Sequence, residues 1–399
     1  MIPSLVRADL AALDRLTYLN TGTAGILPRA AVDAMRASIE EDFTFGRLSP
    51  RRYRKMEDER VLLRGLLARV AGADPDHVVL TTGTVAGVNL IIGARGPRPN
   101  TRTLTTTLEH PDALLPLLQR ERDGGSRVER VVIPDDADDA QIVASFAARI
   151  RRGGPVDTIL VSHVSYATGR ILPVEAIVDT ARALDILTII DGVQAIGALP
   201  VDAPRIGADA YVFSAHKWLQ GPESVGALIL GDRGLEKLDR IPGLGSAAVV
   251  REDHLERAVG ARAIEGVIPG KESVRGAIAA LEWREGLGHG DMLTAETRRV
   301  AGELRSMLRG HPTVRVVTPD SCAGLLSFRF EGLPAGRVSW ELGQARVAVR
   351  DIPGADLVRV SAGYFLDEND LERFDAALRM VGHSPEPESC PIPAATGGA

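Results

Sequence analysis

Two short runs of β-branched and apolar residues, each followed by ionisable side chains, constrain the fold more than any other feature. The first run, Leu187–Ile190, ends at Asp191, and the second, Ala210–Phe213, ends shortly before Lys217. Runs of this kind are typical of buried parallel strands. Because ligands of open α/β sheets bind outside the carboxyl ends of the strands, we expect Asp191 and Lys217 to share one site.

The chemistry of these two residues indicates a cofactor. Lys217 lies between an apolar strand and Trp218, so we expect its amine to be desolvated. Desolvation lowers the pKa of a lysine and frees the nucleophile that forms a Schiff base. Asp191 would be the anion that keeps a pyridine nitrogen protonated, a pairing found in pyridoxal 5'-phosphate (PLP) sites. PLP is therefore the expected cofactor, and no metal site is expected.

The pattern DGxQ…SxHK at 191–217 resembles the class V aminotransferases, fold type I of the PLP-dependent enzymes, which include cysteine desulfurases and isopenicillin N epimerase-like proteins. The resemblance runs from about Tyr18 to about Val381. It implies an α/β fold, with a mostly parallel seven-stranded sheet between helices in a large domain, and a smaller C-terminal α+β domain. Because one scaffold hosts several reactions, the resemblance indicates fold and cofactor more than reaction.

The order of the expected elements agrees with this architecture. From Tyr18 to about Leu230, apolar runs alternate with helical periodicity, which favours βαβ units. Later elements suit the small domain: helices at about Ser273–Glu285, Ala295–Leu308 and Glu368–Val381, and strands near Val314–Val317, Leu325–Phe330, Arg346–Arg350 and Leu357–Val360. We expect an N-terminal arm at 1–16, a PLP-binding domain at 17–250, a small domain at 251–383 and a disordered tail at 384–399.

The resemblance implies a set of cofactor contacts. The segment TTGTVAGVNL follows a strand and opens a helix, so its start fits a phosphate site or a plain helix cap. His110 would stack on the cofactor ring and move protons, or merely initiate the helix at Pro111. The remaining expected contacts are Thr82, Gly83, Thr84, Ser214 and His216 at the phosphate, and Gln194 and Tyr166 at the phenolic oxygen.

For the substrate, the resemblance implies that Arg359 forms a bidentate pair with the α-carboxylate, although a strand-edge surface arginine is the commoner case. Arg350 is a second candidate. The N-terminal segment would line the substrate entrance, with Asn20, Thr21 and Thr23 near the pocket, and Tyr166 would also bind the substrate. The chain departs from the family twice, because Tyr166 stands where desulfurases carry asparagine, and Ile268 stands where the family carries the threonine of Gly-Thr-Pro.

Composition limits the classes of partner that we expect this chain to bind. A net charge of −6 with mixed signs favours neither nucleic acid nor an anionic membrane, and no apolar run approaches a membrane span, so we expect a cytoplasmic protein. The resembling enzymes are dimers, so we expect a homodimer. Neither cysteine, Cys322 or Cys390, matches the mobile-loop nucleophile of the desulfurases. This argues against a persulfide on the protein.

The absent loop cysteine and Tyr166 favour a C–S lyase (β-elimination) or a related tailoring reaction of secondary metabolism, acting on an amino acid or its conjugate. Bound PLP would be an electron sink for an α-carbanion, with Lys217 as acid and base, supported by His110 and Asp191. The alternatives are an aminotransferase, an amino-acid epimerase, a decarboxylation-coupled oxidative deaminase and, outside enzymes, a catalytically inactive PLP-fold regulator.

Overall fold

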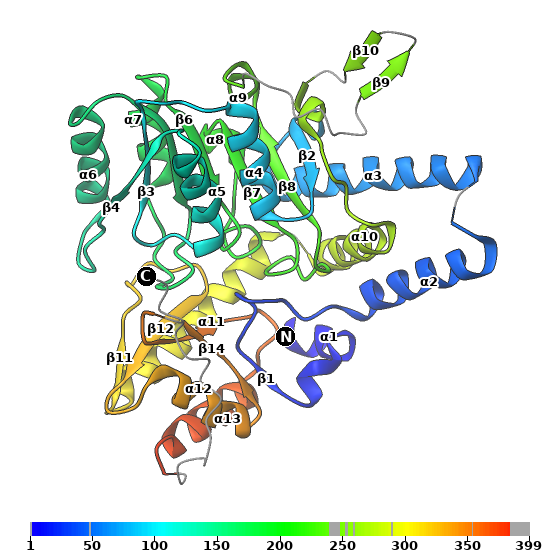
Figure 1. Cartoon of the computed structure of the whole chain (residues 1–399). Helices are drawn as coiled ribbons and strands as arrows, with labels where there is room; N and C mark the ends of the chain where they lie inside the picture. The colour runs from blue at the N-terminus through cyan, green and yellow to red at the C-terminus, as the bar shows by residue number, and fades with distance from the viewer. Residues whose placement is uncertain are drawn as a thin grey trace.

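A computed structural model describes residues 2–47, 49–238, 248–251, 254–257, 260–288, 290–352 and 354–383. The tail expected to be disordered, 384–399, lies outside the described residues. Figure 1 shows a large body built on a seven-stranded sheet, with a smaller body below it built on a four-stranded sheet.

The large sheet has the strand order β2-β8-β7-β6-β5-β3-β4, and every pairing is parallel except those of β8. The mostly parallel seven-stranded sheet predicted from the sequence is therefore confirmed. Its strands are β2 (Val78–Thr81), β3 (Arg102–Thr106), β4 (Arg127–Val131), β5 (Val156–Ser162), β6 (Leu187–Asp191), β7 (Ala210–Ser214) and β8 (Gly226–Leu230).

The central strands are buried on both faces, because successive side chains point to opposite sides of a strand. Ile189 packs into the apolar cluster on one face, and its neighbour Ile190 packs into the cluster on the other. Helices that cover the two faces include α3 (Pro50–Ala71), α4 (Thr84–Arg95), α5 (Pro111–Arg122), α6 (Asp139–Arg151), α7 (Val174–Arg182) and the short α8 (Ala203–Ile206).

The smaller body is antiparallel, with the order β11-β12-β15-β14. The strand predicted at Arg346–Arg350 is divided in two: one half pairs with the N-terminal strand, and the other joins this sheet. The elements are β1 (Thr17–Tyr18), α11 (Gly290–Gly310), β11 (Val314–Val316), β12 (Leu325–Phe330), α12 (Ala335–Gln344), β13 (Val347–Ala348), β14 (Arg350–Ile352), β15 (Leu357–Ser361) and α13 (Glu368–Met380).

The N-terminal segment contributes to the core of the smaller body. It forms α1 (Ile2–Val6) and two 3-10 turns, Arg7–Asp9 and Ala11–Asp14. Val6, Leu10 and Leu13 are buried in the same apolar cluster as Phe328 and Phe374. The first residues of the chain thus help to hold the body that carries β14 and β15.

A helical arm extends from the large body (Figure 1). It consists of α2 (Arg29–Phe45) and the start of α3, and α10 (Lys271–Gly286) packs against both helices. The large body also has a short hairpin, β9 (Ala248–Arg251) with β10 (His254–Arg257), a five-residue helix, α9 (Asp232–Glu236), and two 3-10 turns, Pro75–His77 and Gly260–Ile264. Among the described residues, no helix combines the length and apolarity needed to cross a membrane.

A buried ion pair fixes the edge of the large sheet and generates a stability prediction. Glu265 accepts a hydrogen bond from the backbone of Leu80 at 2.9 Å and pairs with Arg64 of α3 at 2.8 Å, where the side chains are only 4% and 7% exposed. The Glu265→Ala variant leaves a buried guanidinium without its anion, so we expect a loss of about 3 kcal/mol in the free energy of unfolding.

The matched control is Glu285→Ala, whose ion pair with Arg69 is 46% and 58% exposed, and which should cost less than about 1 kcal/mol. Urea unfolding of both variants measures the difference. Equal losses would contradict the structural role of the buried pair.

Candidate active site

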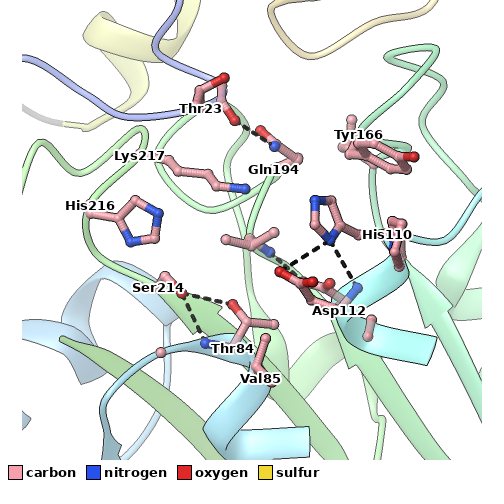
Figure 2. A pocket seen from close by; sticks show the side chains of 18 of the residues that line it. Thr23, Thr84, Val85, His110, Asp112, Tyr166, Gln194, Ser214, His216 and Lys217 are labelled. Atoms are coloured by element: carbon pink, nitrogen blue, oxygen red, sulfur yellow. Dashed lines mark hydrogen bonds and ion pairs between the residues drawn. The ribbon is translucent and has the colours of Figure 1, made fainter. Parts of the chain in front are cut away.

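A cavity of about 800 Å³ lies where the carboxyl ends of the large sheet face the smaller body. Figure 2 shows the side chains that point into it, from strand ends and loops far apart in the sequence. Of the residues predicted for the site, those that line it are Thr82, Gly83, Thr84, His110, Tyr166, Asp191, Gln194, Ser214, His216, Lys217, Arg350 and Arg359. Of the three N-terminal loop residues expected near the pocket, Thr23 lines the cavity beside Gly22, whereas Asn20 and Thr21 do not.

Strand register brings the two central residues together. Asp191 pairs with Ser162 of β5 on one side and with Val212 of β7 on the other, so it ends β6 at the cavity edge. Lys217 follows the end of β7 after a short turn. The sequence-based expectation that Asp191 and Lys217 share one site agrees with this geometry.

The amine of Lys217 is set up as a nucleophile. Burial lowers its pKa to about 8, and the positive charge of Arg359 acts in the same direction, while Asp191 and Asp112 oppose the shift. An ammonium loses hydration when surrounded by protein, so its neutral form becomes easier to reach. At neutral pH a useful fraction of Lys217 is therefore uncharged and able to attack an aldehyde.

Asp191 is a buried acid that requires a cationic partner. It is 3% exposed, and its Oδ1 accepts a hydrogen bond from the Val193 backbone at 3.0 Å. Burial raises its pKa, whereas the Val193 N–H and the charge of Lys217 lower it. A protonated pyridine nitrogen in the cavity would supply the compensation that a buried carboxylate needs.

The orientation of Gln194 is determined by a residue that the sequence indicated only as a bulky neighbour. The indole Nε1 of Trp218 donates to Gln194 Oε1 at 2.9 Å. An indole N–H can only donate, so the amide Nε2 must face the other way, where it donates to the carbonyl of Gly22 at 2.8 Å. The second hydrogen on Nε2 stays available for an acceptor, as the phenolic oxygen of PLP would be.

The Trp218 side chain packs against small residues. A Cβ added to Gly324 would lie 2.9 Å from the indole ring, and one added to Gly197 would lie 3.1 Å from the Cβ of Trp218. Trp218 packs there with Ala323 and Leu325 of the smaller body. This packing thus joins the turn that carries Lys217 and Trp218 to the smaller body.

The start of α4 fits a phosphate. Thr84 donates its backbone N–H to Ser214 Oγ at 2.9 Å, and the two hydroxyls also lie 2.9 Å apart. Gly83 has φ +142°, a conformation that side-chain-bearing residues rarely adopt, and a Cβ there would lie 3.2 Å from Ser214 Oγ. Hydroxyls and backbone amides at a helix N-terminus provide the donors that an anion requires, and both His216 and Thr82 also line this end.

His110 initiates α5, as one of the two expectations had it, and it also lines the cavity; its stacking on a cofactor ring stays a prediction. Its Nδ1 accepts a hydrogen bond from the backbone of Asp112 at 3.2 Å and so caps α5, while the ring lines the cavity. Burial lowers the pKa of His110, followed by the charge of Lys217. The neutral ring therefore carries its proton on Nε2, because Nδ1 is the acceptor.

Tyr166 packs against His110 edge-on, with ring centroids 4.6 Å apart and the planes at 68°. Burial raises the pKa of Tyr166, so its phenol is a hydrogen-bond donor at neutral pH. The aromatic pair forms one wall of the cavity, in line with the pocket role predicted for Tyr166.

Glu109 is a buried residue that sequence reasoning missed. It accepts from Thr106 Oγ1 at 2.6 Å and from the Ser162 backbone at 2.8 Å, so it ties the ends of β3 and β5 together. Burial raises its pKa to about 7. Its position directly before His110 was the only signal in the sequence, and a charged residue beside a histidine does not by itself indicate burial.

Arg359 is held for a carboxylate. Its Nη1 donates to the carbonyl of Tyr166 at 2.9 Å and its Nη2 to Thr23 Oγ1 at 2.7 Å, while the buried Nε has no hydrogen-bond partner among the described residues. Burial lowers its pKa to about 10, helped by the charge of Arg350, so Arg359 remains a cation at neutral pH. A buried cation with an unused donor favours an anionic ligand.

The lowered pKa of Lys217 leads to a pH prediction. The neutral amine persists at lower pH than in an ordinary lysine, which titrates near 10.4, so acylation of Lys217 in the apoprotein should be half-maximal near pH 8. Pulse labelling with acetic anhydride across a pH series, followed by peptide mass spectrometry, measures this midpoint.

The matched control is Asp191→Asn. The charge of Asp191 raises the pKa of Lys217, so its removal should move the midpoint further down. A midpoint near pH 10, or an upward shift in Asp191→Asn, would contradict the electrostatics described above.

Comparison with known proteins agrees with this geometry. Residues 18–374 match the family Aminotransferase class-V. The chain is 30% identical to isopenicillin N epimerase of Streptomyces clavuligerus, over 90% of this chain and 93% of that protein. It is 29% identical to a probable cysteine desulfurase of Pseudomonas aeruginosa, over 94% and 98% of the two chains.

Solved structures confirm the fold. A complex of the cystine C–S lyase C-DES with cysteine persulfide has a TM-score of 0.87 at 24% identity, covering 94% of this chain and all of that chain. The apo cysteine desulfurase of Thermococcus onnurineus has a TM-score of 0.84 at 22% identity, covering 96% and 99%. The resemblance predicted from the DGxQ…SxHK pattern is confirmed: the chain belongs to the class V aminotransferase family and is a PLP-dependent enzyme.

Proposed function

We propose that this enzyme cleaves a carbon–sulfur bond of a sulfur-containing amino acid by β-elimination. The observation that carries the proposal is the described lining of the cavity, which includes a base, Lys217, but no thiol. Cys322, the free cysteine among the described residues, lies beside Arg170 and does not line the cavity. Sulfur freed in such a cavity leaves as a thiol product rather than passing to the protein.

The residues that would hold PLP are those already described. Asp191 would face the pyridine nitrogen, Gln194 the phenolic oxygen, and the start of α4 with Ser214 and His216 the phosphate. Bound PLP would supply an electron sink that makes the α-hydrogen of an amino-acid substrate acidic. The individual contacts stay predictions.

The chain's own residues then have separate tasks. Arg359 holds the α-carboxylate, so that the α-hydrogen faces Lys217. The amine of Lys217 becomes free when the substrate's amino group replaces it; it would then take this proton, and the electron pair left on the α-carbon would expel the sulfur from the β-carbon. His110, with its proton on Nε2, is placed to protonate the departing thiolate. Addition of water to the remaining enamine releases ammonia and, from a cysteine-type substrate, pyruvate.

Epimerisation is the second candidate. It needs proton transfer on both faces of the α-carbon, and Figure 2 shows Lys217 and His110 entering the cavity from different elements. The relative at 30% identity is named an isopenicillin N epimerase, which also supports this reading. Transamination and decarboxylation-coupled oxidative deamination stay possible outcomes of the same assay, and a tailoring role in secondary metabolism stays a prediction.

A product assay tests the proposal. The holoenzyme should release pyruvate with an equal amount of cysteine persulfide from cystine, or of thiol from cysteine S-conjugates, at a rate at least about a hundredfold lower in Lys217→Ala, because the base is lost. Lys55→Ala, an exposed lysine of α3, should match the wild type. Solvent deuterium at the α-carbon without pyruvate would instead assign epimerisation, and conversion of an added keto acid to an amino acid would assign transamination.

We further propose that the enzyme is a homodimer. The arm of α2 and α3 carries exposed apolar side chains, with Ile39 60%, Phe43 84% and Phe45 76% exposed. Apolar side chains gathered on a projecting element mark an interface. Ile268, which replaces the family's threonine, does not line the cavity of its own chain. Sedimentation should give about twice the chain mass of 42.6 kDa, and a monomer would contradict the proposal. The cytoplasmic location also stays a prediction.

A further inference from the structure

A second arginine lies at the cavity beside Arg359. Arg350 begins β14 and is paired directly opposite Arg359 of β15 in the antiparallel register. Both residues line the cavity, as does Ile352. Arg359 is buried at 3% exposure, whereas Arg350 is exposed. The two guanidinium groups therefore lie at different depths of one cavity, with Arg350 nearer to solvent.

The two arginines differ in their partners. Arg359 donates to Tyr166 and Thr23, whereas Arg350 makes no hydrogen bond or ion pair with any residue that the structure describes. Its charge nevertheless reaches its neighbours, because it lowers the pKa of both Arg359 and His110. Like charges directly opposite each other on paired strands repel. An anion between or beside them would relieve this repulsion.

We expect the α-carboxylate of a substrate to pair with Arg359 and not with Arg350. The buried Arg359, with its unused Nε donor, meets the carboxylate next to the α-carbon. The phosphate end of the cavity lies at α4 and Ser214, on the large body, and not at β14. Asp112 is the exposed acid of the lining, and it lies beside His110 on α5. Arg350 thus remains available for a different anionic group.

We propose that Arg350 binds a second anionic group at the far end of the substrate side chain, so that the preferred substrate is an amino acid with an acidic side-chain terminus. This inference rests on the proposed function only in assuming that an amino acid occupies the cavity. The chemistry fits the second carboxylate of a disulfide- or thioether-linked amino acid and that of an S-carboxyalkyl conjugate. Arg350 is then a specificity-determining residue, and Arg359 anchors the end that reacts.

Two nearly isosteric probes isolate the charge. S-carboxymethyl-cysteine and S-carboxamidomethyl-cysteine differ only in a carboxylate replaced by an amide. The dissociation constant of each is measured from the change in visible absorbance of the holoenzyme, without any need for turnover. The wild type should bind the carboxylate probe roughly tenfold more tightly, the effect of one hydrogen bond to a charged group.

The variant Arg350→Gln should remove this preference and leave affinity for the amide probe unchanged. The control Arg315→Gln, an exposed arginine of β11 outside the cavity lining, should behave as the wild type. A preference that survives in Arg350→Gln overturns the inference, and so does an equal loss for both probes, or no absorbance response to either probe in the wild type.

The readout also separates this inference from the proposed reaction. If the wild type shows the charge preference but releases no pyruvate, β-elimination fails and the anionic subsite stands. If pyruvate is released at equal efficiency from both probes, with equal dissociation constants, the subsite fails and β-elimination stands.

Discussion

The parallel register of β5, β6 and β7 is the constraint on which the whole site depends. It ends three strands at one edge, so Ser162, Asp191 and Ser214 face the same cavity. Side chains alternate along a strand, and a slip of one residue would turn Asp191 toward the opposite face. The register is fixed by apolar side chains on both faces, Ile189 on one and Ile190 on the other. The packing of the core therefore also fixes the position of Asp191.

The lining of the cavity includes three largely buried ionisable groups: Asp191, Lys217 and Arg359. Burial raises the pKa of Asp191 and lowers the pKa of Lys217 and Arg359; the charges of Asp191 and Lys217 partly offset each other, whereas Arg359 adds to the cost of charging Lys217. A cofactor with a cationic ring nitrogen, an aldehyde and a phosphate complements this distribution at three points. The same reasoning places an acidic substrate terminus beside Arg350, because the Arg350 guanidinium has no anionic partner among the described residues.

The sequence predicted what local pattern encodes, and missed what long-range contact decides. The apolar runs ending at Asp191 and before Lys217 predicted adjacent strands and a shared site, because strand ends and their polar residues are contiguous in the chain. The donor that orients Gln194 could not be predicted, since Trp218 reaches it only through the folded turn. Likewise, of the loop residues expected near the pocket, Thr23 lines the cavity whereas Asn20 and Thr21 do not, because the exact exit angle of that loop depends on its contact with Ser361.

The central claim is that the amine of Lys217 forms the covalent bond to PLP, and trapping that bond tests it most directly. The holoenzyme is reduced with borohydride, digested, and its peptides are weighed by mass spectrometry. The account predicts that the reduced pyridoxyl phosphate mass is found on the peptide containing Lys217 and is missing from the Lys217→Ala variant. A label on a peptide containing Lys55, Lys237 or Lys271, or no label on any peptide, would contradict it.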